Sequence, residues 1–347
     1  MNPLKLKSAV LFKLNSSLKI LDIKIPKLKK NQVLVKIFYS AICRSQIMEI
    51  FSGRNNKKYL PHMLGHEASG KVIKSYDNKK FKENDDVILT WIKSDLKDSI
   101  NPSYKFKNKK INSGKVTTFS NYAIVSQDRL VKKPKNISFK NSVLLGCCFM
   151  TGPGMVLNET KPKKDSKIII IGLGAVGLGC FLALKSKGIN SIVVIEKNKK
   201  KILLAKKIGI KLILSSINTQ SRKKIIKFFG SKADICYDSA GGIETLEKSL
   251  SLIKNNGLLH FASHPDEKLR MKIKPYDFII GKRISGSWAG GSKPERDVKK
   301  FSKIIEKNQR LINSLLAKEY KLENINNAIR DFMEGKVFRP IIKMMHE

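Results

Sequence analysis

Acidic and aromatic residues are both scarce in this 347-residue chain. Only 28 aspartates and glutamates stand against 69 lysines and arginines, which gives a formal charge of +41, and aromatic residues make up 7%. Such a charge is typical of proteins that bind nucleic acids or anionic membranes. However, the lysines are spread over the whole length, and arginine is rare, so the chain lacks the arginine and aromatic platforms that read bases. We therefore expect weak, salt-sensitive attraction to polyanions and no specific nucleic-acid partner.

Cysteines and long apolar runs are also few. The cysteines are odd in number and irregular in spacing, which argues against a disulfide framework and for a reducing compartment. An apolar stretch at 9–12 is too short for a signal peptide, and the longer one at 168–184 is interrupted by glycines as a buried strand and a buried helix would be. We therefore expect a soluble, cytoplasmic protein with no membrane contact. The five cysteines are Cys43, Cys147, Cys148, Cys180 and Cys236.

A short apolar run that breaks directly into a Gly-x-Gly-x-x-Gly motif is the most informative stretch. Four isoleucines precede Gly172, Gly174 and Gly177, and a second apolar run further on ends in Glu196. The glycines let the backbone approach a pyrophosphate at a helix N-terminus, and the carboxylate accepts hydrogen bonds from a ribose. Glycine-rich turns that bind nothing also occur, but here the strand, the helix and the acid all lie where dinucleotide binding needs them. The motif therefore predicts a dinucleotide-binding unit.

Two regions with different patterns follow one another along the chain. Before residue 131, short β-type segments alternate with glycine, proline and asparagine turns, which predicts a small barrel. From residue 167 onward strands alternate with helices, which predicts a doubly wound parallel sheet. After residue 291 the pattern becomes helical, and it ends in a strand at 340–344 that we expect to rejoin the first region. The strands expected in the parallel sheet are 168–171, 192–195, 212–214, 235–238 and 258–262.

Three separated segments hold residues of the types that bind transition metals. Cys43 follows a predicted strand, His66 stands in Gly-His-Glu, and Cys147 stands in Gly-Cys-Cys. Taken singly, a cysteine is usually a small buried hydrophobe and a histidine a structural or surface group. Their significance therefore depends on whether the fold brings them together.

Taken in order, these segments resemble the zinc-dependent alcohol dehydrogenases of the medium-chain dehydrogenase/reductase superfamily, over essentially the whole chain. The resemblance implies a GroES-like β-barrel catalytic domain at 1–150, completed by 289–347, and a Rossmann NAD-binding domain at 151–288. It also implies a homodimer. The matching motifs are Cys-Arg-Ser at 43–45, Gly-His-Glu at 65–67, Thr-Thr-Phe-Ser-Asn-Tyr at 117–122, Gly-Cys-x-x-x-Thr-Gly at 146–152 and Gly-Lys-x-x-Arg at 335–339.

The resemblance implies one catalytic zinc ion. Cys43, His66 and Cys147 would bind it and leave its fourth position for water or the substrate oxygen, while Glu67 would act beside the metal. Two thiolates and one imidazole form a tetrahedral site that polarises an alcohol or a carbonyl group without redox change. Cys148 competes with Cys147 as the third ligand, because spacing alone does not exclude it, although the Thr-Gly pair that follows favours Cys147.

The chain departs from the family pattern in two places. Many relatives carry a second, structural zinc ion in a lobe with four cysteines, whereas the corresponding region at 91–115 has none, so we expect no structural zinc. In better-studied relatives a histidine five residues after the first cysteine passes the hydroxyl proton to solvent, and Met48 stands at that position here. The Ser45 hydroxyl can still take the proton, but the sequence does not show where the proton goes next.

Charge favours NAD over NADP as the cofactor. Glu196 can accept hydrogen bonds from both adenosine ribose hydroxyls and repels a 2′-phosphate, while nearby lysines, among them Lys201, soften that repulsion, so NADP remains possible. The resemblance implies further cofactor contacts from Thr151 and Lys201, and it implies that Arg44 and Arg339 clamp the pyrophosphate from the other domain.

The sequence as a whole therefore predicts an α/β oxidoreductase that moves hydride between NAD(H) and an alcohol or carbonyl compound on zinc. A polyol or a sugar-derived alcohol is an alternative substrate, and Trp91 is equally expected to line the substrate pocket or to belong to the core. The competing class is a noncatalytic binder of polyanions or nucleic acid on a dehydrogenase scaffold. The complete set of three ligands argues against that class and against a zinc-free reductase of the same fold.

Overall fold

The computed structural model describes residues 5–51, 57–77, 80–263, 265 and 268–346. The chain divides into two compact units. Unit 1 comprises Met1–Cys147 and Lys293–Glu347, and unit 2 comprises Cys148–Ser292. Among the helices of the described ranges, none combines the length and the apolar character needed to cross a membrane.

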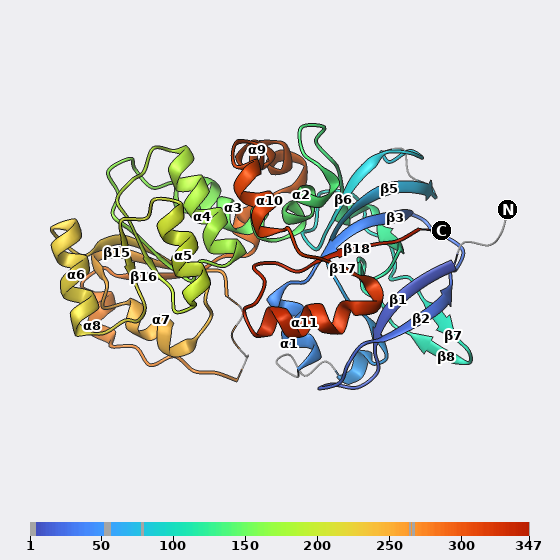
Figure 1. Cartoon of the computed structure of the whole chain (residues 1–347), viewed down its shortest axis with the longest axis horizontal. Coiled ribbons are helices and arrows are strands. Elements are labelled where there is room, and N and C mark those ends of the chain that lie inside the picture. Colours follow the sequence, from blue (N-terminus) through green and yellow to red (C-terminus); the bar gives the residue numbers. More distant parts are fainter. Residues whose placement is uncertain (1–4, 52–56, 78–79, 264, 266–267, 347) are drawn as a thin grey trace. The chain divides into compact units, whose positions relative to one another are not determined.

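Unit 1 is built around largely antiparallel sheets that enclose a core of mainly aliphatic side chains. Its long strand β3 pairs with β5, β9 and β18, so the strand near the C-terminus is joined to the sheet near the N-terminus (Figure 1). Val35, Ile37, Val72 and Val87 are completely buried between these strands. The main sheet contains β10 (Leu130–Lys132), β6 (Asp86–Thr90), β5 (Glu67–Ser75), β3 (Gln32–Ala41), β18 (Ile341–Lys343), β17 (Glu319–Lys321) and β9 (Tyr122–Ser126).

Smaller elements of unit 1 flank this sheet. A three-stranded sheet has the order β2 (Lys19–Lys24), β1 (Lys5–Leu11) and β4 (His62–Met63), and β7 (Tyr104–Phe106) pairs with β8 (Lys109–Ile111). β1 thus begins before the apolar stretch at 9–12 and ends within it. The α-helices of this unit are α1 (Arg44–Ile50), α2 (Phe139–Ser142), α9 (Pro294–Lys307), α10 (Gln309–Leu315) and α11 (Ile325–Met333).

Unit 2 is the doubly wound parallel sheet that the sequence predicts. Its strand order is β13 (Leu212–Leu214), β12 (Ile192–Ile195), β11 (Ile168–Ile171), β14 (Ala233–Asp238), β15 (Ile253–Phe261) and β16 (Arg283–Gly286), and every neighbouring pair is parallel. The first strand in sequence lies third in space, which creates the reversal of strand order at which dinucleotides bind. The α-helices are α3 (Cys148–Gly154), α4 (Ala175–Ser186), α5 (Lys199–Lys207), α6 (Thr219–Phe229), α7 (Ile243–Ser249) and α8 (Pro275–Ile279), and a π-helix, Met155–Thr160, follows α3.

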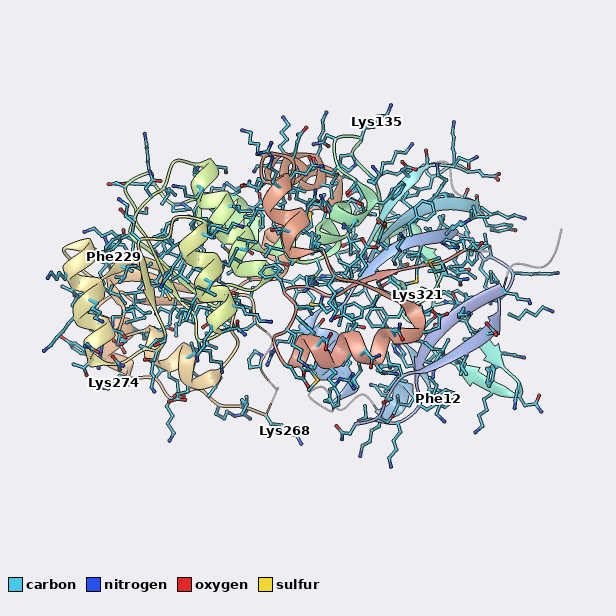
Figure 2. All side chains as sticks on the ribbon, viewed as in Figure 1. Phe12, Lys135, Phe229, Lys268, Lys274 and Lys321 are labelled. Carbon is cyan, nitrogen blue, oxygen red and sulfur yellow. The ribbon has the colours of Figure 1, made fainter. Side chains whose placement is uncertain are left out.

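The fold leaves the lysines spread over both units. Figure 2 shows long side chains with nitrogen at their tips on unit 1 and on unit 2, including Lys135 and Lys274. Many of the ion pairs that lysines form join half-exposed or exposed partners, such as Lys30 with Asp77. Pairs of this kind contribute little to stability, so the positive charge is mainly a property of the solvated surface.

Candidate functional site

Three segments of unit 1 converge on one small cluster. Cys43 is the residue just before α1, His66 directly precedes β5, and Cys147 follows a short 3₁₀ turn at Val143–Gly146. Together with Glu67, these residues bring one potential ligand atom each to within 4.8 Å of one another. The structure thus brings together the three residues that the sequence nominated for a metal and Glu67, which the sequence nominated to act beside it.

The spacing of the thiols suits a zinc ion. Cys43 Sγ and Cys147 Sγ are 4.0 Å apart and form no disulfide. Two thiolates at the usual zinc–sulfur distance of about 2.3 Å, separated by a tetrahedral angle, would stand roughly 3.8 Å apart. A hydrogen bond between the thiols lowers the pKa of Cys43 well below its ordinary value, so that one thiolate is already favoured in the metal-free fold. This donor set therefore fits a tetrahedral zinc site with one open position.

The imidazole of His66 is held by Gln46, a residue that the sequence reasoning missed. Gln46 Nε2 lies 3.1 Å from His66 Nδ1, and the Gln46 side-chain oxygen accepts a hydrogen bond from the Gly65 backbone N–H. His66 Nε2 is buried and has no hydrogen-bond partner within the described ranges. As the Gln46 amide is oriented, its nitrogen donates to Nδ1. A proton on Nδ1, with the lone pair of Nε2 left for a metal, requires the amide oxygen of Gln46 to turn toward the ring. The sequence signal that could have pointed to Gln46 is its spacing from Cys43, because residues three apart lie about one helical turn apart.

Gly65 is required by the local backbone. Its φ of +92° lies in the left-handed region, and a methyl group at this position would overlap the Thr118 hydroxyl and Phe119. A glycine therefore lets the chain turn tightly just before His66 and place the imidazole next to the thiols.

Glu67 forms a buried ion pair with Arg339 beside the cluster. Glu67 is fully buried, Arg339 is 5% exposed, and Glu67 Oε1 lies 4.0 Å from His66 Nε2. Burial raises the pKa of Glu67 to about 7, and the guanidinium of Arg339 opposes that increase. The sequence assigned Arg339 to a pyrophosphate, whereas the structure places it against Glu67. An arginine has five N–H donors, so contact with a carboxylate still leaves donors for an anion.

The remaining nominated residues of unit 1 lie on α1 and near His66. Arg44 is exposed, and the Ser45 hydroxyl is buried without a hydrogen-bond partner among the residues that the structure describes. The ring of Trp91 stands edge-on to that of His66, with 6.5 Å between their centroids. Trp91 thus lies beside the cluster and is only half-buried, so it is not simply a core residue.

In unit 2, the glycine motif and Glu196 form one hydrogen-bonded constellation. The backbone N–H of Leu173 donates to Glu196 Oε2 at 2.7 Å, and that of Asn198 donates to Oε1 at 2.9 Å. Lys201 Nζ stands 4.0 Å from Glu196 Oε2. The carboxylate at the end of β12 is therefore fixed against the loop between β11 and α4.

The glycines of this loop serve close backbone packing. A methyl group on Gly177 would overlap the carbonyl oxygen of Gly172, so only glycine lets α4 begin this close to β11. Gly174 immediately precedes α4, whose N-terminal amides point away from the helix toward the loop.

Thr151, the other cofactor contact expected in unit 2, is a buried residue of α3.

The other cysteines lie outside the cluster. Cys148, Cys180 and Cys236 are fully or almost fully buried, and none of them belongs to the group of metal-binding side chains found in the described part of the chain. Burial raises the pKa of Cys180 and of Cys236 above the ordinary value, which is typical of structural thiols.

Comparison with known proteins agrees with this geometry. The family model for an alcohol dehydrogenase GroES-like domain matches residues 29–135, and that for a zinc-binding dehydrogenase matches residues 175–307. Alcohol dehydrogenase 6 of Peromyscus maniculatus is 25% identical over 98% of both chains, and alcohol dehydrogenase class-3 of Drosophila melanogaster is 26% identical over 97% of both.

Solved structures agree with the fold. Benzyl alcohol dehydrogenase from Acinetobacter calcoaceticus superposes with a TM-score of 0.86 at 22% identity, over 99% of this chain and 100% of its own. An alcohol dehydrogenase zinc-binding domain protein from Burkholderia ambifaria reaches a TM-score of 0.89 at 20% identity, with the same coverage. The family models, the relatives that align end to end and the shared fold lead to one conclusion. The chain belongs to the zinc-type medium-chain alcohol dehydrogenase family and is an oxidoreductase of alcohols or carbonyl compounds.

Proposed function

We propose that this protein transfers a hydride between NAD(H) and an alcohol or the corresponding carbonyl compound, with a single zinc ion held by Cys43, His66 and Cys147. The observation that carries the proposal is the convergence of these three ligand atoms from separate segments, with 4.0 Å between the thiols. Zinc supplies Lewis acidity that polarises the substrate oxygen without changing its own oxidation state. We propose no structural zinc, because residues 91–115 contain no cysteine.

In this proposal the residues around the ligands handle charge and protons. Ser45 holds a buried hydroxyl on α1 that can take the proton of the substrate alcohol. Glu67 and Arg339 form an ion pair beside His66, so the buried charge of each residue is compensated by the other next to the cluster. Gln46 orients the His66 ring.

We propose NAD as the preferred cofactor, with Gly172, Gly174 and Gly177 against the pyrophosphate and Glu196 on the adenosine ribose. Support comes from the position of Glu196, whose carboxylate is fixed at the end of β12 by two backbone N–H groups. A carboxylate there repels a 2′-phosphate, although Lys201 weakens this repulsion. The further cofactor contacts that we propose are Thr151, Lys201, Arg44 and Arg339.

An assay of dehydrogenase activity tests the proposal. Zinc-loaded protein is incubated with NAD⁺ and a panel of primary alcohols, secondary alcohols, diols and sugar alcohols, and formation of NADH is followed by absorbance. We expect oxidation of at least one member of the panel. Replacement of Cys147 by serine should abolish that activity, whereas the matched change of Cys148 should retain it. Absence of activity across the panel in both directions, or full activity of Cys147→Ser, would contradict the proposal.

We further propose that the protein is a homodimer and works in the cytoplasm. Strand β16 is an edge of the parallel sheet, and large apolar side chains are exposed in the neighbouring segments, among them Ile279 and Trp288 at 78% and 69%. An unpaired edge beside exposed apolar groups favours pairing with a second copy. The five free thiols suit a reducing compartment. Light scattering coupled to gel filtration tests the dimer, and Ile279→Glu should shift it toward monomer.

A further inference from the structure

Alcohol oxidation leaves a proton that this chain must remove. The hydride carries the carbon-bound hydrogen and its electron pair to the nicotinamide, so the hydroxyl proton is released when the carbon–oxygen double bond forms. Ser45 is a candidate to receive it, since its hydroxyl is buried on α1 two residues after Cys43 and has no hydrogen-bond partner in the described part of the chain. A serine hydroxyl passes a proton on only if another group takes its own.

The helix that carries Ser45 offers one base. Glu49 is four residues further along α1, so the two side chains lie on the same face with about 5–6 Å between their Cβ atoms. Met48 has a thioether that cannot hold a proton, and Arg44 is a cation. Gln46 is occupied by His66 and Gly65. A single water molecule can bridge the gap between the hydroxyl and the carboxylate.

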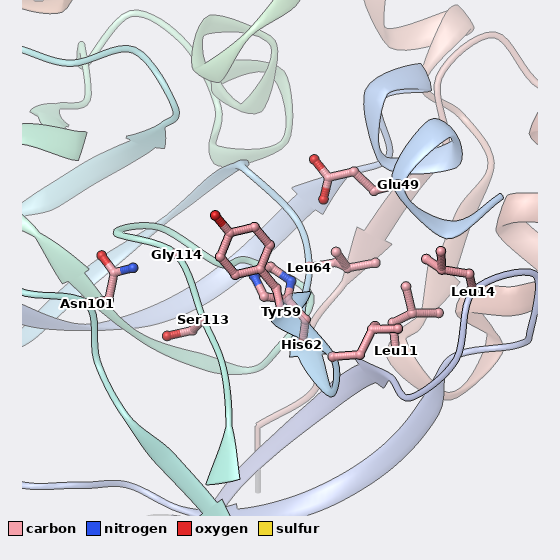
Figure 3. A pocket seen from close by; sticks show the side chains of 10 residues that line it. Leu11, Leu14, Glu49, Tyr59, His62, Leu64, Asn101, Ser113 and Gly114 are labelled. Carbon is pink, nitrogen blue, oxygen red and sulfur yellow. The ribbon is translucent and has the colours of Figure 1, made fainter. Parts of the chain in front are cut away.

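Glu49 also lines a cavity in unit 1. The cavity has a volume of about 270 Å³, and Figure 3 shows Glu49 extending from α1 toward the side on which Tyr59 stands. That volume accommodates several water molecules, each of which occupies about 30 Å³ in the liquid. The polar lining residues can hold such waters, and they include Tyr59, His62, Asn101 and Ser113.

His62, an ionisable residue that also lines the cavity, is a poor acceptor. Burial lowers the pKa of His62 to about 4, so its imidazole stays neutral at physiological pH and does not retain a proton.

We propose that Glu49 is the proton acceptor of alcohol oxidation, and this inference rests on the proposed dehydrogenase function. The substrate hydroxyl gives its proton to Ser45 Oγ, the Ser45 proton passes through a bridging water to the Glu49 carboxylate, and Glu49 releases it to water in the cavity. The net release is one proton for each NAD⁺ reduced, and carbonyl reduction runs the same path in reverse. Glu49 acts through Ser45 and does not itself contact the reacting carbon.

The test uses zinc-loaded Glu49→Gln with the exposed Glu83→Gln as matched control. We expect the turnover rate of alcohol oxidation at pH 7 to fall about a hundredfold in Glu49→Gln, the low end of what a positioned proton acceptor contributes, with KM and zinc content close to those of wild type. Glu83→Gln should be unchanged. Added imidazole should speed Glu49→Gln in proportion to its concentration and leave wild type unaffected, because a small base replaces the missing carboxylate.

Two further variants separate proton transfer from a structural effect. Glu49→Asp should retain more activity than Glu49→Gln, and Met48→His should restore much of the rate in the Glu49→Gln background while giving little gain in wild type. The solvent isotope effect should increase in Glu49→Gln, and the substrate deuterium effect should decrease.

Activity of Glu49→Gln within twofold of wild type, or a loss that neither imidazole nor Met48→His relieves, would overturn the assignment of Glu49. If wild type oxidises no alcohol, the proposed function itself fails. If wild type is active and the activity of Glu49→Gln is unchanged, only the role of Glu49 is contradicted.

Discussion

Replacement of Arg339 by methionine isolates the energetic role of the buried ion pair. The change leaves Glu67 fully buried beside His66 without its partner, and removal of one member of a buried pair typically costs about 3–5 kcal/mol. Glu67 can escape part of this cost by binding a proton. In wild type the pKa of Glu67 is already raised to about 7. Keeping this carboxyl group protonated therefore costs almost no free energy at pH 7 and about 3 kcal/mol at pH 9, at roughly 1.4 kcal/mol per pH unit.

The loss of stability should therefore depend on pH. In Arg339→Met the folded state holds an extra proton between pH 7 and 9 relative to wild type, so its stability falls as the pH rises through that window. We expect the free energy of unfolding to decrease by about 3 kcal/mol at pH 9, and by distinctly less at pH 7. For a domain of 150–250 residues, such a loss lowers Tm by about 6–12 °C.

Urea unfolding of metal-free protein at pH 7 and pH 9 measures this difference, with reductant present to keep the thiols free. Arg330→Met, at an exposed position of α11, is the matched control and should change stability little. The double variant with Glu67→Gln should recover most of the loss, because it removes the buried charge. A loss below about 1 kcal/mol at pH 9, or one that is equal at both pH values, would refute this reasoning.

Three further predictions concern the cofactor, acid stability and the metal. Glu196→Ala should weaken NAD binding about tenfold to a hundredfold, as expected for lost hydrogen bonds to a charged group, and should strengthen NADP binding. An unchanged ratio of the two affinities in titrations would mean that Glu196 does not face the ribose. Wild type should lose up to about 3 kcal/mol as the pH falls from 6.5 to 4, because His62 is neutral when folded and takes a proton when unfolded. His62→Gln should flatten that part of the unfolding profile, and an equally steep profile would rule out His62 as the cause. Gln46→Glu should tighten zinc binding about tenfold in competition with a chelator, because a carboxylate can accept hydrogen bonds from both Gly65 and His66. Equal or weaker zinc binding would exclude Gln46 as the group that fixes the imidazole.

The dinucleotide-binding unit could be predicted from the sequence because its signals are local. The isoleucine run of β11, the glycines that follow and Glu196 all lie within about thirty residues, and each has a spacing set by strand and helix geometry. The predicted strands 168–171, 192–195 and 212–214 agree with β11, β12 and β13. β15 begins earlier than expected, at the buried Ile253, because the exposed polar residues 254–256 that follow it interrupt the apolar pattern.

The cluster in unit 1 depends on contacts that no local pattern contains. Cys43 and Cys147 are 104 residues apart, and Glu67 and Arg339 are 272 apart. Resemblance to a family could nominate the ligands, but the pairing of Glu67 with Arg339 and the support of His66 by Gln46 follow from side-chain packing across several strands. A sequence pattern does not encode such packing, because many residue types at those positions are compatible with the same strands and helices.

The zinc content of purified protein tests the central claim most directly. Elemental analysis of wild type and of the serine variants of Cys43, Cys147 and Cys148, together with His66→Ala, measures metal per chain after exhaustive dialysis. We expect close to one zinc ion per chain in wild type and in Cys148→Ser, and almost none in Cys43→Ser, His66→Ala and Cys147→Ser, because each of these three removes one ligand. Two zinc ions per chain, or a full complement of zinc in Cys147→Ser, would contradict the account.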